Sequence, residues 1–271
     1  MSDGLAPLKM VVFDWAGTMV DFGCKAPVRA IAKALSEEGL TVGEAEIRAD
    51  MGLAKIEHVR KLLANPVVAQ VWEDRYGQPV GEDDVLRVYH RLEPLMVEAA
   101  AEAAVLIPGA QSLFQTLKSA GLRVASTTGY TRAMMEPVLA RAAEQGYRPD
   151  LVTCAGETRA GRPSPLMMYR SCVELGIWPI EHVVKVDDAP AGIGEGLSAG
   201  AWTVGVAASG NGVGLSLAEL QALPAAERRT RIDDGRRMLE TAGAHFVVDT
   251  VADILPVLNH IAVSTRAGAH P

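Results

Sequence analysis

The sequence predicts an α/β fold in which a doubly wound parallel sheet carries an inserted all-helical cap domain. First, an apolar run at residues 10–13 ends at Asp14 near the start of the 271-residue chain, as a buried central strand of a parallel sheet does. Second, helical periodicity with almost no strand signal then fills about 80 residues. Third, strands and helices alternate through the rest, which indicates a Rossmann-like sheet covered on both faces.

The inserted segment is predicted to contain five helices. Pro27 stands near the start of the first helix and Gly39 follows its end, positions that these residues favour. The predicted helices span residues 27–38, 44–50, 53–63, 67–76 and 82–103.

The helical block divides the chain into two predicted domains. Residues 1–24 and 104–271 form the α/β core, and residues 25–103 form the cap. Ligands bind at the carboxyl ends of strands in open parallel sheets. A block inserted directly after the first strand is therefore expected to lie over that edge as a lid.

After the cap, the predicted elements follow one another in regular alternation. The predicted strands span residues 122–126, 151–153, 182–186, 202–206 and 246–248, and the predicted helices span 110–119, 132–144, 165–175, a segment that ends at Ala199, and 251–261. The polar segment 209–237 is expected to hold one or two surface helices, and the tail 264–271 to be frayed.

Composition limits which partners the protein can bind and in which cellular compartment it is expected. A net charge of −7 leaves no basic footprint for nucleic acid, and an acidic protein that binds an anion needs local positive charge. Cys24, Cys154 and Cys172 lack metal-site spacing and are odd in number, which favours a reducing cytoplasm. We find no apolar run that spans a membrane and no signal-peptide pattern, so a cytoplasmic protein is expected.

Polar residues follow several predicted strands of the core. In a parallel sheet these carboxyl ends share one edge, so the side chains are expected to converge. Asp14 by itself is equally well explained as a turn cap. The polar positions are Asp14, Thr127, Thr128, Arg162, Asp187 and Asp188.

These motifs resemble the haloacid dehalogenase superfamily over essentially the whole chain. The matching stretches are DWAGT at 14–18, STTGYT at 126–131, GRPSP at 161–165 and VDD at 186–188. Within that superfamily, MGLAKIEH at 51–58 resembles the cap segment of the phosphonatases, which bears a Schiff-base lysine.

The resemblance implies that Asp14 is a nucleophile that attacks phosphorus and forms an acyl phosphate. It also implies Mg²⁺ held by Asp14, Asp188 and the backbone carbonyl of Ala16, since this hard cation prefers oxygen ligands. Helix capping is the alternative role for Asp187 or Asp188. Many superfamily members have another acid a few residues after the fourth-motif Asp, where the corresponding region of this chain is Ala191-Gly192. The ligand set therefore has fewer carboxylates or includes Asp187.

Ala16 occupies the position where related phosphatases carry a second Asp, which protonates the departing oxygen. One interpretation is an inactive relative. The other is that the leaving group is a carbanion, which needs an electron sink such as an imine between a lysine and a neighbouring aldehyde. Lys55 is the candidate lysine, because burial among small and apolar residues would lower its pKa. His58 lies on the same helix face and is a candidate proton shuttle. A solvated lysine and a partly exposed histidine are the alternatives.

The remaining candidate residues are assigned to the substrate. The Arg162 guanidinium and the Thr128 hydroxyl suit contacts with phosphonyl oxygens. Gly52 allows close backbone approach, or is a simple turn glycine. By resemblance, Cys24, Met51 and Tyr130 line the pocket; from the sequence alone, each is explained equally by packing.

The predicted activity is Mg²⁺-dependent hydrolysis of the C–P bond of phosphonoacetaldehyde to acetaldehyde and phosphate, in aminoethylphosphonate degradation. A phosphomonoester phosphatase or phosphomutase of the same superfamily is one alternative, and a catalytically silent ligand-binding relative is another. Dehalogenation needs no metal and gives Asp188 no role. The resemblance also suggests a homodimer through the cap.

Overall fold

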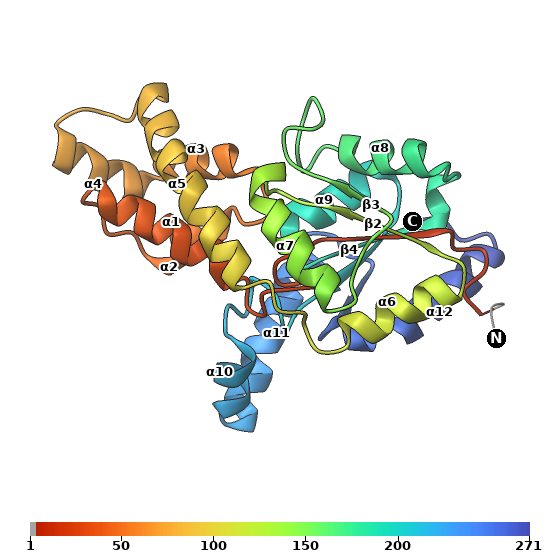
Figure 1. Ribbon diagram of the computed structural model, residues 1–271. Coiled ribbons are helices and arrows are strands. Elements are labelled where there is room, and N and C mark those ends of the chain that lie inside the picture. Colours follow the sequence, from red (N-terminus) through yellow and green to blue (C-terminus); the bar gives the residue numbers. More distant parts are fainter. Residues whose placement is uncertain (1–3) are drawn as a thin grey trace.

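The computed structural model describes residues 4–271, and within them six strands form one parallel sheet in the order β3-β2-β1-β4-β5-β6 (Figure 1). The first strand therefore lies at the centre, where Met10 is paired with Arg123 on one side and with Val183 on the other. The strands are β1 (Met10–Phe13), β2 (Arg123–Thr127), β3 (Leu151–Thr153), β4 (Val183–Asp187), β5 (Trp202–Val206) and β6 (Phe246–Val248). The predicted doubly wound sheet is confirmed.

Apolar residues of the central strand alternate between two helical layers, as the period of two in a strand requires. Met10 and Val12 belong to a core cluster with Met168 of α8, whereas Val11 and Phe13 belong to the larger core on the other face. Figure 1 shows α8 and α9 on one side of the sheet and α6 and α12 on the other. The helices are α6 (Ala110–Ser119), α7 (Arg132–Glu144), α8 (Leu166–Leu175), α9 (Pro190–Ala199), α10 (Leu217–Ala222), α11 (Ala225–Thr241) and α12 (Ile254–Arg266), with 3₁₀ turns η1 (Ile180–His182) and η2 (Val251–Asp253).

The helical insertion, here called the cap, extends to the left of the sheet in Figure 1. It comprises α1 (Lys25–Glu37), α2 (Glu44–Ala49), α3 (Lys55–Ala64), α4 (Pro66–Tyr76) and α5 (Glu82–Glu102). Helices α1 and α5 pack closely together, and buried side chains such as Trp72 and Leu92 connect the cap to the main core cluster. The cap thus contains the five helices predicted.

Several predicted boundaries were wrong by one to five residues. Helix α3 begins at Lys55 rather than at 53, because Gly52 is left-handed (φ 91°) and Ala54 has an extended ψ of 137°. Strand β4 runs through Asp187, so this acid is the last residue of the strand. The tail is helical as far as Arg266, so the fraying expected at 264–266 was wrong.

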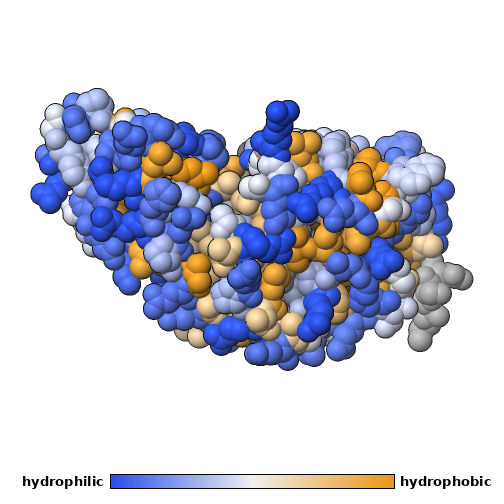
Figure 2. Space-filling view, turned by 45° about the horizontal axis from the view of Figure 1, so that its top comes forward, coloured by the Kyte–Doolittle hydropathy of each residue, from blue (hydrophilic) through white to orange (hydrophobic). Residues whose placement is uncertain are grey.

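The surface and the ends of the chain add three observations. Figure 2 shows hydrophilic side chains over most of one face, with hydrophobic patches between them. Among the described residues, no helix has the length and apolar character needed to cross a bilayer. Residues 1–3, which the predicted core domain includes, lie outside the described part.

Candidate active site

Asp14 directly follows β1 and lies at the carboxyl edge of the sheet. Its backbone N–H donates to Val186 O at 2.9 Å, which continues the pairing with β4. Its Oδ1 accepts a 2.8 Å hydrogen bond from Arg162 Nη1. The guanidinium of Arg162 also donates to Thr127 O and to Glu195 Oε2. The carboxylate is therefore oriented by a buried cation whose own position is fixed by the sheet.

Three buried carboxylates gather at this edge. Asp14, Asp187 and Asp188 each offer one oxygen, and these oxygens lie within 4.8 Å of one another. Burial, followed by repulsion from Asp187, raises the pKa of Asp14 to about 6. Burial, followed by the charges of Asp14 and Asp187, raises the pKa of Asp188 well above its usual value. Clustered carboxylates that resist ionisation suit a divalent cation, which would neutralise their charge.

Asp188 is held by backbone and hydroxyl groups of two neighbouring loops. Its Oδ2 accepts from the Asn211 backbone N–H at 2.7 Å, and its Oδ1 accepts from Thr18 Oγ1 at 3.4 Å. Gly17 has φ +85°, and a Cβ at this position would lie 2.2 Å from Asp188 Oδ2. The glycine of the first motif is therefore required both by its backbone conformation and by the carboxylate beside it.

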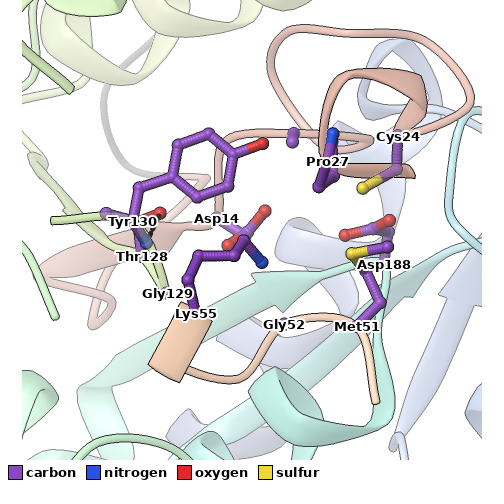
Figure 3. A pocket seen from close by; sticks show the side chains of 11 residues that line it. Asp14, Cys24, Pro27, Met51, Gly52, Lys55, Thr128, Gly129, Tyr130 and Asp188 are labelled. Atoms are coloured by element: carbon purple, nitrogen blue, oxygen red, sulfur yellow. Dashed lines mark hydrogen bonds between the residues drawn. The ribbon is translucent and has the colours of Figure 1, made fainter. Parts of the chain in front are cut away.

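Lys55 enters the site from the cap as the first residue of α3. Its side chain is 2% exposed, and burial lowers its pKa to about 8. The Nζ lies 5.2 Å from the centroid of the Tyr130 ring. Figure 3 shows the amine beside Asp14, with Asp188 farther along the same cavity. The site thus places a weakly basic amine next to a carboxylate.

The space between the cap and the sheet is a small cavity. It holds ≈ 290 Å³ of empty space, a volume that includes space open to solvent. At Gly129 the cap approaches so closely that a Cβ would lie 2.3 Å from Leu53 O. The cavity therefore suits a ligand of only a few heavy atoms. Its lining residues are Asp14, Ala16, Cys24, Pro27, Met51, Gly52, Lys55, Thr128, Gly129, Tyr130 and Asp188 (Figure 3).

Comparison with known proteins gives one consistent result. The family model for haloacid dehalogenase-like hydrolases matches residues 8–200. The chain is 42% identical over 264 residues to a phosphonoacetaldehyde hydrolase from Paraburkholderia phytofirmans, with 97% of this chain and 99% of that protein covered. It is 38% identical over 254 residues to one from Bacillus cereus, covering 94% of this chain and 96% of that protein. The crystal structure of a phosphonoacetaldehyde hydrolase-like protein from Oleispira antarctica superposes with a TM-score of 0.97 at 39% identity, covering 98% and 97% of the two chains.

The chain belongs to the phosphonoacetaldehyde hydrolase family of haloacid dehalogenase-like hydrolases. The family assignment makes this protein a hydrolase. It also agrees with the motifs at 14–18 and 51–58, which the structure brings together in the lining of one cavity.

Gly192 belongs to the Ala191-Gly192 region where the sequence led us to look for a further acid, and the structure leaves no room for a side chain at 192. A Cβ at this position would lie 1.8 Å from Asp187 Oδ2. The Asp187 carboxylate therefore occupies the space that a side chain at 192 would need. Its Oδ1 accepts from the Ala189 backbone N–H at 3.1 Å, and its Oδ2 lies 3.1 Å from Lys185 Nζ. Asp188 lines the cavity, whereas Asp187 is not among the lining residues found in the described part of the chain.

The other residues predicted for the site fall into two groups. Cys24, Met51, Gly52, Thr128 and Tyr130 line the cavity together with Asp14, Ala16, Lys55 and Asp188. In the described part of the chain, Arg162 and His58 are not among its lining residues. Arg162 still contacts the site, since it holds Asp14 from below.

His58 is turned away from the cavity. Its Nε2–H donates to Ile47 O at 2.8 Å, and Nδ1 has no hydrogen-bond partner among residues 4–271. Burial, together with the charge of Lys55, lowers the pKa of His58 to about 3. This imidazole is therefore neutral near pH 7, and in this arrangement it ties α3 to α2.

Sequence reasoning missed two charged residues beneath the site. Lys185 and Glu195 are both 0% exposed. Glu195 Oε2 lies 3.1 Å from Lys185 Nζ and 3.0 Å from Arg162 Nε. A signal was present in the sequence, because each is the lone charged side chain within an apolar stretch, Val183–Val186 for Lys185 and Pro190–Ala199 for Glu195.

Proposed function

We propose that this protein hydrolyses the C–P bond of phosphonoacetaldehyde and releases acetaldehyde and phosphate. One observation carries the proposal: a buried lysine amine with a pKa lowered to about 8 lines the same small cavity as the nucleophilic carboxylate Asp14. An ordinary phosphate ester gives such an amine no role. The names of the full-length relatives support the same substrate.

The first step joins the substrate to Lys55. At neutral pH about one tenth of an amine with a pKa near 8 is uncharged, and this form attacks the aldehyde carbon. Water leaves, and a protonated imine remains on Nζ. The positively charged imine nitrogen is now an electron sink separated from phosphorus by two carbon atoms.

The second step transfers phosphorus to Asp14. A carboxylate oxygen attacks the phosphorus atom while the C–P bond breaks, and the electron pair of that bond moves into the imine to give an enamine. Arg162 orients the attacking carboxylate through its 2.8 Å hydrogen bond to Oδ1. Thr128 lines the cavity, and its hydroxyl is available to the phosphonyl oxygens. Fixed positions of this kind lower the barrier by orientation and electrostatic stabilisation.

We further propose that the required cation is Mg²⁺, held by Asp14, Asp188 and the backbone carbonyl of Ala16. The buried oxygen atoms of the acidic cluster support an oxygen-preferring cation. When bound, it supplies positive charge that offsets repulsion between the carboxylates and the phosphonate. Asp187 adds a third negative charge to this cluster, and its Oδ2 lies 3.1 Å from Lys185 Nζ.

Two hydrolyses complete the turnover. Water attacks the acyl phosphate on Asp14 and frees phosphate. The enamine takes up a proton at carbon, and water then hydrolyses the imine to acetaldehyde and the free Lys55 amine. The leaving group is an enamine carbon rather than an alkoxide, so the absence of an acid side chain at Ala16 is consistent with this chemistry. The closed cap limits access of bulk water to the imine.

The first experiment follows acetaldehyde and phosphate together, for the wild type and for Lys55→Arg, with Mg²⁺ present. We expect equal amounts of both products from the wild type and a loss of at least 1,000-fold in Lys55→Arg, since arginine stays protonated. Borohydride added during turnover is expected to fix an ethyl group on Lys55, located by peptide mass. Phosphate release from esters that does not depend on Lys55 would support the phosphatase alternative, and binding without release would support the silent relative.

The cellular setting is also proposed. The substrate class fits the degradation of aminoethylphosphonate, and the buried free thiols of Cys24, Cys154 and Cys172 fit the reducing cytoplasm. A homodimer through the cap remains a prediction. Light scattering of the purified protein, compared with the 28.7 kDa chain mass, tests it directly.

A further inference from the structure

Arg48 of α2 reaches out of the cap and binds loops of the core. Its Nη1 donates to Asn211 Oδ1 at 3.0 Å and to Gly23 O at 3.1 Å, while Nη2 donates to Gly214 O at 3.1 Å. The Arg48 side chain is 13% exposed. One cap side chain thus contacts both the connection from β1 to α1 and the loop after β5.

Asn211 returns these contacts and extends them to the acidic cluster. Its Nδ2 donates to Arg48 O at 3.0 Å, and its backbone N–H donates to Asp188 Oδ2 at 2.7 Å. Asn211 is 4% exposed. The residue that binds the cap arginine is therefore the same residue that holds the carboxylate facing the cavity.

The packing around Arg48 leaves little freedom for the loop. A Cβ at Gly214, which has φ +69°, would lie 2.8 Å from Arg48 Cζ. In the core, the Arg48 guanidinium donates to backbone carbonyls and to the side-chain amide of Asn211, all of them neutral. Among residues 4–271, its one charged partner is Glu44 of the same helix, 2.7 Å away. Hydrogen bonds from a charged donor to neutral acceptors are about twice as strong as neutral ones. They also depend less on ionic strength than a surface ion pair does.

On the other side, α2 is joined to the helix that begins with Lys55. His58 Nε2–H donates to Ile47 O, the carbonyl adjacent to Arg48 in the chain. A continuous path of hydrogen bonds and backbone therefore runs from Asp188 through Asn211, Arg48 and Ile47 to His58 on α3.

We propose that Arg48 and Asn211 are positioning residues that clamp the cap onto the core and set Lys55 opposite Asp14 and Asp188. The predicted change in KM rests on the proposed function. The predicted change in cap mobility, measured by amide exchange, rests on the structure alone. Without the clamp, the fraction of molecules with a closed cap falls. The apparent affinity for substrate then falls by the same factor.

The test compares Arg48→Met, Arg48→Lys, Asn211→Ala and the Arg48→Met/Asn211→Ala double variant. Asn211→Ala removes the amide side chain and keeps the backbone N–H that donates to Asp188. Arg60→Met is the matched control, because Arg60 pairs with Glu57 and Glu82 inside the cap. Each protein is assayed for KM and kcat, and for backbone amide exchange of residues 44–55 and 209–214.

We expect KM to rise about tenfold in Arg48→Met and in Asn211→Ala, with a smaller change in kcat and an intermediate value for Arg48→Lys. Amide exchange in both segments should speed up together, and the double variant should resemble the single ones, because either loss opens the same clamp. Arg60→Met should keep the KM of the wild type.

The proposal is overturned if Arg48→Met matches Arg60→Met in KM and exchange, or if the double variant shows the product of the two single effects. Amide exchange needs no substrate. A wild type inactive on phosphonoacetaldehyde would therefore refute the proposed function while the exchange data still decided the clamp.

Discussion

At the scale of single residues, the environment of Lys55 determines what its amine can do. The side chain is 2% exposed, and desolvation lowers its pKa from 10.5 to about 8. Nearby acids, among them Asp14 and Asp188, act in the opposite direction and keep the pKa from falling further. With a pKa of about 8, the amine has both forms available near neutral pH: the charged form pairs with anions, and the uncharged form attacks a carbonyl.

The first prediction concerns pH. Because the uncharged amine is the reactive form, kcat/KM for phosphonoacetaldehyde should rise with pH and level off above about 8, the pKa of Lys55. Initial rates at saturating Mg²⁺ between pH 6 and 9.5 give the profile. A profile that is flat across pH 7–9 would exclude titration of Lys55 in the free enzyme.

The second prediction concerns the stability cost of the same amine. The pKa of Lys55 is about 8 in the folded protein and 10.5 as its ordinary value. Between these two pH values the unfolded chain therefore binds more protons than the folded one. The free energy of unfolding should accordingly rise from pH 8 to 10.5. Lys55→Met should remove this slope and raise the free energy of unfolding at pH 7 by about 2 kcal/mol, although the variant is inactive. Urea unfolding at pH 7 and pH 10 measures both effects. A variant less stable than the wild type at pH 7 would contradict the argument.

The third prediction concerns the glycine of the first motif. Gly17→Ala adds a Cβ that would lie 2.2 Å from Asp188 Oδ2 at φ +85°, so it should cost at least about 2 kcal/mol of stability and displace the carboxylate. Gly156→Ala is the matched control, since φ is +87° but the added Cβ meets nothing within 4 Å. That variant should cost about 1 kcal/mol from backbone strain and keep full metal binding. Thermal unfolding and Mn²⁺ titration separate the two effects, and equal losses in both variants would show that backbone strain alone matters.

At the scale of elements, strand β4 and helix α9 meet through buried ions rather than through apolar packing alone. Lys185 and Glu195 lie 3.1 Å apart with no exposed side-chain surface, and Arg162 joins them at 3.0 Å. Thr127 of β2 adds its hydroxyl, which accepts from Lys185 Nζ at 2.7 Å. These buried residues orient Arg162, which in turn contacts Asp14 at 2.8 Å.

The fourth prediction follows from the pairing among these buried residues. Glu195→Gln leaves Lys185 and Arg162 with one fewer anion in a buried site and should cost about 3–5 kcal/mol. The Lys185→Met/Glu195→Gln double variant removes one charge of each sign and should recover at least half of that loss. Urea unfolding of the two single variants and the double variant measures the coupling. Additive losses would show that the ion pair is not energetically coupled.

At the scale of the whole molecule, the cap and the sheet close around a cluster of acids that resists being charged. Burial raises the pKa of both Asp14 and Asp188. For an acid whose folded pKa is raised, stability falls as the pH climbs from the unfolded value of 3.8 towards the folded one. Near neutral pH, the ionised forms of these buried acids therefore lower the free energy of unfolding. A bound cation would neutralise their charge and offset that loss.

The fifth prediction uses this balance. Mg²⁺ at about 100 times its dissociation constant should stabilise the wild type by about 2.7 kcal/mol. Asp188→Asn should be more stable than the wild type in EDTA and should gain little from Mg²⁺, so that the order of the two melting temperatures reverses when the metal is added. Thermal unfolding with EDTA and with Mg²⁺ tests this. A variant that keeps the full shift would remove Asp188 from the ligand set.

The sequence by itself determined the order of strands and helices and most of the cavity. Periodicity placed the strands at 10–13, 151–153, 202–206 and 246–248 correctly, because a buried strand and a helix face differ in period. The motifs located Asp14 and Asp188 because these residues lie at the ends of predicted strands. Lys55 was located by the resemblance of segment 51–58 to the phosphonatase cap.

The tertiary structure alone decided the placement of Asp187, the orientation of His58 and the contacts made by Arg48. Each depends on atoms far apart in the chain: the space left at Gly192, the carbonyl of Ile47 on a different helix, and the amide of Asn211. A sequence pattern reports the face on which a side chain lies, whereas hydrogen bonds between distant segments are fixed only when the cap and the sheet pack together.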